Sequence, residues 1–158
     1  MNDALAYRDD PEFARFLPHI PQPFTRRDAE AFVALNISGP WERSPVFAVA
    51  LGDRLIGTVN LELDAESRTA VLGYAIGRQW WGQGLALEAA QAALAWAVAT
   101  FGLRRVSAST DARHVRSQRV LEKLGMQRET LRIADHPGRE GNSVDEVVYA
   151  LTVVPRPV

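Results

Sequence analysis

The sequence predicts an α/β fold of the mixed α+β type, with one mostly antiparallel mixed sheet flanked by helices. Its 158 residues, 47% of them hydrophobic and 23% charged, suffice for one hydrophobic core. The periodic patterns run in the order strands, helix, strand, helix, strands, which is typical of helices packed on a single sheet. No repeat or low-complexity linker divides the chain, so we expect residues 1–158 to form a single domain.

The N-terminal region is predicted to contain short helical pieces between prolines. Residues 1–10, "MNDALAYRDD", are weakly patterned and give no clear element. Prolines 18, 21 and 23 make a stiff connector. Thr25 followed three residues later by Asp28 resembles a capping box that opens a helix through Ala34.

Three strands are expected next, as an antiparallel meander. Residues 46–50 and 54–63 read as two strands joined by a turn at Gly52 and Asp53. Alternation in the second strand places Asn60 and Glu62 together on its polar face. Residues 69–76 form the third strand.

A long helix follows a loop that is rich in glycine and tryptophan. An apolar stripe repeats at spacings of three and four, and its members are Leu87, Ala90, Leu94, Ala97 and Phe101. Gly102 is the expected C-cap of this helix.

The rest of the chain alternates short elements. Residues 106–110 read as a strand and residues 114–124 as a helix that Gly125 stops. Two last strands, residues 130–134 and 144–153, flank the loop "DHPGREGNS".

Composition narrows the classes of partner. A formal net charge of -1 and a pI near 6.3 lack the basic footprint that nucleic acids or anionic membranes require, so neither partner is expected. The chain has no cysteine, which excludes disulfides and thiolate metal sites and suits a cytoplasmic location. Its three histidines show no metal-ligand spacing, so no metal is expected. We also find no signal-peptide pattern and no apolar run typical of a membrane span.

The loop between the third strand and the long helix predicts an anion site. Gly82 and Gly84 precede a helix that starts without a Ser, Thr, Asp or Asn cap. N–H groups at a helix start that have no side-chain acceptor are suited to bind a phosphate, and glycine lets the phosphate approach the backbone closely. The P-loop pattern fails because no lysine follows Gly84, and the dinucleotide fingerprint fails because Leu87 occupies its last glycine position. The alternative interpretation is that the two glycines form a purely structural turn that binds no ligand.

Residues 79–84, "QWWGQG", match the pattern [Q/R]-x-x-G-x-[G/A]. This resembles the pyrophosphate-binding signature of the GNAT superfamily of acyl-CoA-dependent N-acyltransferases, and "LGYAIGRQWWGQGLALEA" is similar to its RimJ/RimL branch. Three further segments agree with that branch, namely "RFLPHIPQPFTRRDAEAFV", "LIGTVNLEL" and "ARHVRSQRVLEKLGMQRE". The resemblance runs from about Asp10 to the end. The first strand of the family should precede Asp10, and is either absent or upstream.

The resemblance implies that acetyl-CoA binds as the acyl donor. The strands at residues 69–76 and 106–110 would then splay apart, and the backbone of the first would pair with the pantetheine arm. His114 stands where the family has asparagine, which offers both a donor and an acceptor. The implied cofactor-binding residues are Tyr74, Ala75, Ile76, Gln79, Gly82, Gln83, Gly84, Leu85, Ala86, His114 and Ser117.

Roles in the chemistry follow from the same resemblance. Ser117 is expected to donate a proton to the leaving thiolate, and the Ile76 N–H to polarise the thioester carbonyl. His136 is the expected base, with an unperturbed pKa near 6.5. Asn60 and Glu62 are alternatives that would orient the amine or relay a proton, and Trp81 is expected to wall the acceptor site.

The predicted activity is acetyl transfer to a primary amine, on a protein N-terminus or a small molecule. A homodimer is a further expectation by resemblance. A noncatalytic acyl-CoA-binding module is the main alternative, and an interaction domain without a ligand would leave the uncapped helix start unexplained.

Overall fold

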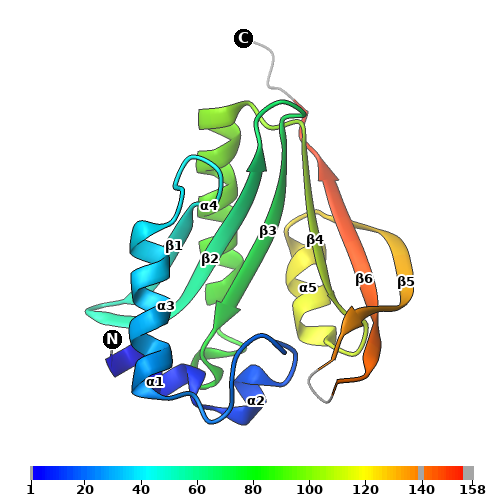
Figure 1. Cartoon of the computed structure of the whole chain (residues 1–158). Helices are drawn as coiled ribbons and strands as arrows, with labels where there is room; N and C mark the ends of the chain where they lie inside the picture. The colour runs from blue at the N-terminus through cyan, green and yellow to red at the C-terminus, as the bar shows by residue number, and fades with distance from the viewer. Residues whose placement is uncertain (1, 139–140, 155–158) are drawn as a thin grey trace.

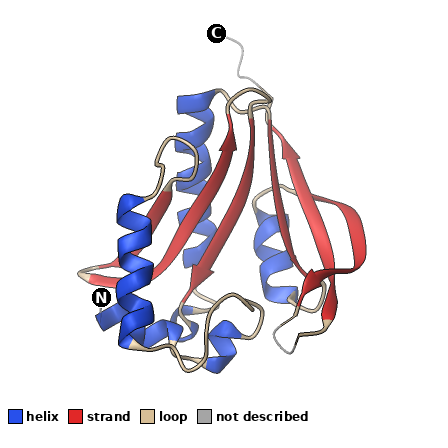
Figure 2. Ribbon diagram, in the orientation of Figure 1, coloured by secondary structure: helices blue, strands red, loops and turns tan. Residues whose placement is uncertain are grey.

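The computed structural model describes residues 2–138 and 141–154, with the side chains of residues 135 and 136 excepted. A six-stranded sheet with the order β1-β2-β3-β4-β6-β5 forms its centre (Figures 1 and 2). The elements in chain order are α1 (Asn2–Arg8), α2 (Pro11–Ala14), α3 (Arg26–Ser38), β1 (Val46–Leu51), β2 (Arg54–Asp64), β3 (Thr69–Ile76), the 3-10 turn η1 (Arg78–Trp80), α4 (Leu85–Phe101), β4 (Arg105–Asp111), α5 (Val115–Lys123), β5 (Gln127–Pro137) and β6 (Ser143–Thr152). The predicted mixed α+β fold is confirmed.

The sheet opens between its two halves. Every neighbouring pair is antiparallel except β3 and β4, which are parallel. Their pairing extends only from Thr69–Arg105 to Val71–Ser107. Beyond those residues the strands diverge toward their C-terminal ends, at the lower edge of the sheet in Figure 1. The expected splay is therefore confirmed, and it leaves backbone groups of β3 without a neighbouring strand.

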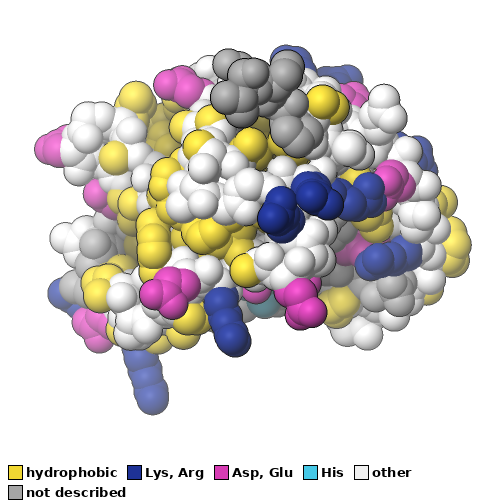
Figure 3. Space-filling model, turned by 90° about the horizontal axis from the view of Figure 1, so that it is seen from above, with side chains coloured by type: hydrophobic (Ala, Val, Ile, Leu, Met, Phe, Trp, Pro, Cys, Tyr) yellow, Lys and Arg dark blue, Asp and Glu magenta, His cyan; other side chains and the backbone are white. Residues whose placement is uncertain are grey.

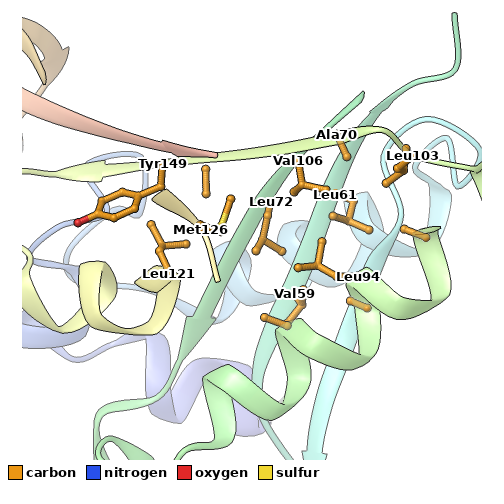
Figure 4. Packing of buried hydrophobic residues seen from close by; sticks show 14 of the residues in the cluster. Val59, Leu61, Ala70, Leu72, Leu94, Leu103, Val106, Leu121, Met126 and Tyr149 are labelled. Carbon is orange, nitrogen blue, oxygen red and sulfur yellow. The ribbon is translucent and has the colours of Figure 1, made fainter. Parts of the chain in front are cut away.

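Helices cover both faces of the sheet (Figure 2). The main core lies between the sheet and the two helices α4 and α5. Figure 4 shows Leu94 of α4 pointing toward Leu61, and Leu121 of α5 pointing toward Tyr149. On the other face, α1, α2 and α3 enclose a second cluster, whose buried members are Ala4, Tyr7, Phe13, Ala14, Ile20, Phe24 and Ala29. The two clusters therefore pack against opposite faces of the sheet.

The predicted capping box at the start of α3 is present. The Asp28 N–H donates to the Thr25 hydroxyl at 3.3 Å, and the Thr25 N–H donates to the Asp28 carboxylate at 2.8 Å. The helix continues to Ser38, beyond the predicted end at Ala34. Nothing in the local sequence stops it there, since the first helix breaker is Gly39.

Residues 2–8 form the helix α1 rather than the family's first strand, and no β-strand occurs in residues 2–45. Ala4 and Tyr7 are buried, and the Leu55 N–H of β2 donates to the Asp3 carboxylate at 3.1 Å. A seven-residue helix shows too few turns for its apolar side to be recognised in a sequence. Tertiary packing on β2 decides its conformation.

The end of the molecule where β3 and β4 pair carries charges of both signs. Lys and Arg side chains lie intermingled with Asp and Glu side chains, and hydrophobic side chains show between them (Figure 3). This agrees with the formal net charge of -1. None of the helices in the described ranges is long and apolar enough to cross a bilayer.

Candidate active site

A cavity of about 600 Å³ lies on the face of the sheet that α4 and α5 cover. The end of β3, the glycine loop, the first turn of α4 and one side of α5 line it. We call it the helix-side cavity. Its size matches that of a small-molecule or cofactor site.

The start of α4 presents bare amides to this cavity. Gly82 and Gly84 have φ angles of 76° and 80°, in the left-handed region that favours glycine. Gly84 is the N-cap and supplies no side-chain bond, and the first intrahelical bond runs from Glu88 N–H to the Gly84 carbonyl. The N–H groups of residues 85–87 therefore lack intrahelical acceptors. A Cβ added to either glycine would meet nothing within 4 Å, so the space over the loop is open to a ligand.

Basic side chains line the same cavity. Arg116, Arg119 and Lys123 come from one face of α5, at spacings of three and four, and Arg78 comes from η1. Together with the positive end of the α4 dipole they suit a polyanion such as a diphosphate. From the sequence, the basic run at residues 113–119, which contains Arg116 and Arg119, could hold a small anion, whereas Arg78 and Lys123 were not predicted.

The open edge of β3 offers backbone groups in an alternating pattern. The Gly77 N–H donates to the Ile56 carbonyl at 2.8 Å, and the β2–β3 register is continuous. Opposed residues in an antiparallel ladder alternate between hydrogen-bonded and non-hydrogen-bonded pairs. Counting back from Gly77, the backbone N–H and carbonyl of Ala75 are therefore directed toward Thr58 of β2. The N–H groups of Tyr74 and Ile76 consequently face the gap toward β4. The Ile76 carbonyl accepts the Trp81 indole N–H at 2.6 Å.

A second cavity, of about 550 Å³, lies on the face that α3 covers. We call it the α3-side cavity. Thr58, Asn60 and Glu62 of β2 line one wall, and residues of α1 and α3 line another. Six residues line both cavities, and they are Phe16, Leu17, Tyr74, Ala75, His114 and Ser117. The two cavities therefore meet at the split between β3 and β4.

Tyr74 and Ser117 are hydrogen-bonded at this junction. The Tyr74 hydroxyl lies 2.9 Å from the Ser117 Oγ and donates to the Ser117 carbonyl at 3.0 Å. Burial raises the pKa of Tyr74 to about 12. The bond of 2.9 Å allows either hydroxyl to donate to the other, so Tyr74 can also donate to the Ser117 Oγ.

His114 forms another part of the junction. Its ring stacks on Phe16, with 4.2 Å between centroids and an angle of 16°. Burial is the largest cause that lowers the pKa of His114, to about 4, so the imidazole is neutral at pH 7. The turn before it is held by buried Asp111, which accepts from the Arg113 N–H at 2.8 Å and from its Nη2 at 2.6 Å.

The predicted site residues divide between the two cavities. Tyr74, Ala75, His114 and Ser117 line both, Ile76, Gly82, Gly84, Leu85 and Ala86 line the helix-side cavity, and Asn60 and Glu62 line the α3-side cavity. Trp81 lines the helix-side cavity with the Arg116 guanidinium 4.8 Å from its ring, and it does not line the α3-side cavity. Gln79 and Gln83 are exposed and line neither cavity. His136 pairs with Val144 through its backbone, and its side chain lies outside the described residues.

Over the described ranges, the structure groups no three His, Asp or Glu side chains that could hold a metal ion. The two cavities are lined instead by backbone amides, hydroxyl groups, the imidazoles of His19 and His114, a set of cations, and the separate carboxylates of Glu12, Glu62 and Asp111.

Comparison with known proteins supports an acyl-transfer reading of this geometry. The profile of the acetyltransferase (GNAT) domain family matches residues 2–127. An uncharacterized N-acetyltransferase of Bacillus licheniformis, p20, is 29% identical over 151 residues, which cover 92% of this chain and 83% of that protein.

Solved structures agree in fold. A GNAT-family acetyltransferase from Bacillus anthracis is 27% identical with a TM-score of 0.83, covering 96% of this chain and 87% of its own. RimL, a ribosomal L7/L12 alpha-N-protein acetyltransferase solved with coenzyme A, shares the fold at 16% identity and a TM-score of 0.80, covering 96% of this chain and 86% of its own.

Proposed function

The chain belongs to the GNAT acetyltransferase family and is an acetyl-CoA-dependent N-acetyltransferase; from this premise we propose that it acetylates a primary amine, on a protein N-terminus or a small molecule, as a RimJ/RimL-like enzyme. The acetyl group passes directly to the amine in a ternary complex. One observation supports this most strongly: two cavities on opposite faces of the sheet meet at Tyr74 and Ser117. Donor and acceptor can therefore reach the same point from opposite sides.

The helix-side cavity fits the donor, because acetyl-CoA combines a diphosphate, an amide-bearing pantetheine arm and a reactive thioester. The N–H groups of residues 85–87 and the neighbouring cations suit the diphosphate. The N–H groups of Tyr74 and Ile76 face the gap in which the pantetheine amides would replace a missing strand. The thioester then lies at the junction, where the Ile76 N–H would stabilise the negative charge that develops on the carbonyl oxygen.

The α3-side cavity fits the amine. Asn60 and Glu62 line it, and the exposed Glu62 carboxylate accepts the Ser44 hydroxyl at 3.3 Å. We assign Glu62 to orient the amine and to take its proton through water. His136, the base expected from the sequence, is the alternative to Glu62.

Ser117 completes the transfer. The amine nitrogen bonds to the acetyl carbon as the carbon–sulfur bond breaks, and the Ser117 hydroxyl gives its proton to the departing sulfur. The proton that left the nitrogen returns to Ser117 through water, so the enzyme ends unchanged. Tyr74 holds the Ser117 hydroxyl at the junction through the bond of 2.9 Å.

A thiol-release assay tests this proposal. Acetyl-CoA is mixed with a panel of peptides that have free N-termini and a panel of small primary amines, with N-acetylated peptides as the matched blank. We expect CoA release that depends on both enzyme and acceptor, with the acetyl group found on the amine nitrogen by mass spectrometry. Binding of acetyl-CoA without transfer to any amine would contradict the proposal. The Glu62→Gln and His136→Ala variants then separate the two candidate bases, since a base must be deprotonated to act and only loss of the true base removes the low-pH limb of the pH profile.

A further inference from the structure

Arg8, at the end of α1, is a buried arginine in the wall of the α3-side cavity. It is 7% exposed, and its guanidinium carbon lies 3.9 Å from the centroid of the Phe32 ring and 5.3 Å from that of Phe24. Its Nε is buried without a hydrogen-bond partner. None of the described carboxylates forms an ion pair with it.

Burying the Arg8 guanidinium without an ion pair is unfavourable unless a ligand supplies the missing negative charge. Buried charges in proteins are normally paired, because removing a charge from water is costly. Stacking on Phe32 stabilises the face of the guanidinium, but it leaves the Nε–H at its edge without an acceptor. The hydroxyl of neighbouring Tyr7 is also buried and forms no hydrogen bond of normal geometry; burial raises the pKa of Tyr7, and the nearby Arg8 opposes that rise. The second cluster thus holds a desolvated cation whose donors border a cavity.

The acids that line the same cavity do not neutralise Arg8. Asp111 is bound by Arg113, and Glu62 is exposed on the β2 wall, where it suits an amine. The cavity therefore offers a site for positive charge on one wall and a buried cation on another. An acceptor with an amine at one end and an acid group at the other would match both.

We propose that Arg8 binds an acidic group of the acceptor, a carboxylate or a phosphate, so that the enzyme acetylates amines that also carry an anion. This rests on the proposed function, because it assigns the α3-side cavity to the acceptor. The guanidinium fork pairs with either anion through two parallel hydrogen bonds. A cavity of about 550 Å³ has room for a small amino acid or an amino-alkyl phosphate.

Calorimetric titration tests the inference directly, with and without saturating CoA. The probes are aminopropyl phosphate, aminobutanoate and aminobutanamide, which share an amine and an alkyl chain and differ in the end group. We expect the phosphate or the carboxylate to bind about tenfold to a hundredfold more tightly than the neutral amide. Comparison of the two anions identifies which acid group the site prefers.

Variants test whether Arg8 causes the preference for the anionic probes. Arg8→Gln should remove the preference for the anion, and Arg8→Lys should keep part of it because the charge remains without the fork. Arg15→Gln is the matched control, since it also removes one positive charge but from an exposed side chain that pairs with Glu12. Its preference should equal that of the wild type.

Equal binding of all three probes by the wild type, or no binding of any, would overturn the inference without needing a variant. So would a folded Arg8→Gln protein that keeps the preference. CoA binding is scored in the same titrations, and Arg8 does not line the helix-side cavity. If the wild type did not bind CoA, that result would count against the proposed function alone. Titration of the three probes without CoA would still show whether Arg8 binds an acidic group.

Discussion

At the scale of single residues, the hydroxyl groups of Tyr74 and Ser117 occupy the point where the two cavities join. Tyr74 is fixed by burial on β3, and Ser117 lies in the first turn of α5. Of these two residues, only Ser117 was assigned a proton-transfer role from the sequence. The structure adds Tyr74 as its hydrogen-bond partner.

Replacing Ser117 should mainly slow the chemical step. We expect Ser117→Ala to lower kcat by about a hundredfold, because general acid catalysis contributes about that factor or more. The KM for acetyl-CoA should change little. Tyr74→Phe should have a smaller effect, since it removes the hydroxyl that positions Ser117. Steady-state thiol release measures both, and a Ser117→Ala enzyme with unchanged kcat would disprove the assignment.

His114 predicts a defined pH dependence of stability. Its folded-state pKa of about 4 is lower than the value of 6.5 for an unperturbed histidine, so the unfolded chain binds a proton first as pH falls. The stability that the neutral ring contributes is complete above pH 6.5 and decreases as pH falls toward 4. After allowance for solvent screening, we expect this to amount to about 1 kcal/mol or more.

Urea unfolding of the wild type and of His114→Asn across this range measures the effect. The difference in unfolding free energy between the two proteins should shrink or reverse on acidification from pH 6.5 to pH 4. Taking the difference removes contributions from the other histidines. A constant difference over the range would show that His114 is not held in a desolvated, neutral state.

At the scale of elements, the N-terminus of α4 carries the proposed diphosphate contact. Gly84 and Gly102 cap opposite ends of this helix, both with positive φ and with open space where a Cβ would be added. Substitution at either position costs similar backbone strain, about 1–2 kcal/mol. Only Gly84 borders the helix-side cavity.

The two glycines therefore give a matched pair of variants. Gly84→Ala should weaken CoA binding at least about tenfold, because the methyl group enters the space of the diphosphate, whereas Gly102→Ala should leave it unchanged. Calorimetry with CoA measures the affinities, and thermal unfolding checks that both variants lose similar stability. Equal CoA affinity in the two variants would argue against a diphosphate at this helix start.

Local sequence patterns predicted the strands and longer helices well. Period-two alternation located β2 and β3, and the capping box located the start of α3, because these signals arise within a few residues. The helix α1 was missed since its seven residues are stabilised mainly by contacts with β2. Element ends were less accurate than element types, as in α3.

The site was only partly predictable for a related reason. The motif around Gly82 and Gly84 lies on one continuous stretch, so resemblance located it. Arg8 and Ser117 are more than a hundred residues apart and line the same cavity only after folding. Burial of Arg8 without a counter-charge has no signature in the sequence. Trp81 was expected to wall the acceptor site, and in the structure it lines the helix-side cavity with its indole N–H bonded to the Ile76 carbonyl.

At the scale of the whole molecule, the split sheet gives the proposed donor and acceptor sites separate entrances. The two cavities lie on opposite faces and share only the residues of the junction. The chain also lacks cysteine, the strongest candidate for an acetylated enzyme intermediate. Both features favour direct transfer.

Initial rates measured over a matrix of acetyl-CoA and amine concentrations should consequently give intersecting double-reciprocal lines. CoA should inhibit competitively against acetyl-CoA and noncompetitively against the amine. Parallel lines, together with acetyl-protein trapped in the absence of an amine, would instead indicate a covalent intermediate. Intact-mass spectrometry supplies that second observation.

The most direct test of the account is amide hydrogen exchange by NMR with and without CoA. The account predicts that CoA slows exchange of the N–H groups of Tyr74, Ile76 and residues 85–87, which face the gap or the open helix start. The Ala75 N–H should already exchange slowly in the free protein, because β2 binds it. If CoA bound without protecting these amides, or protected none on α4, the proposed docking of the cofactor between β3 and the helix start would be contradicted.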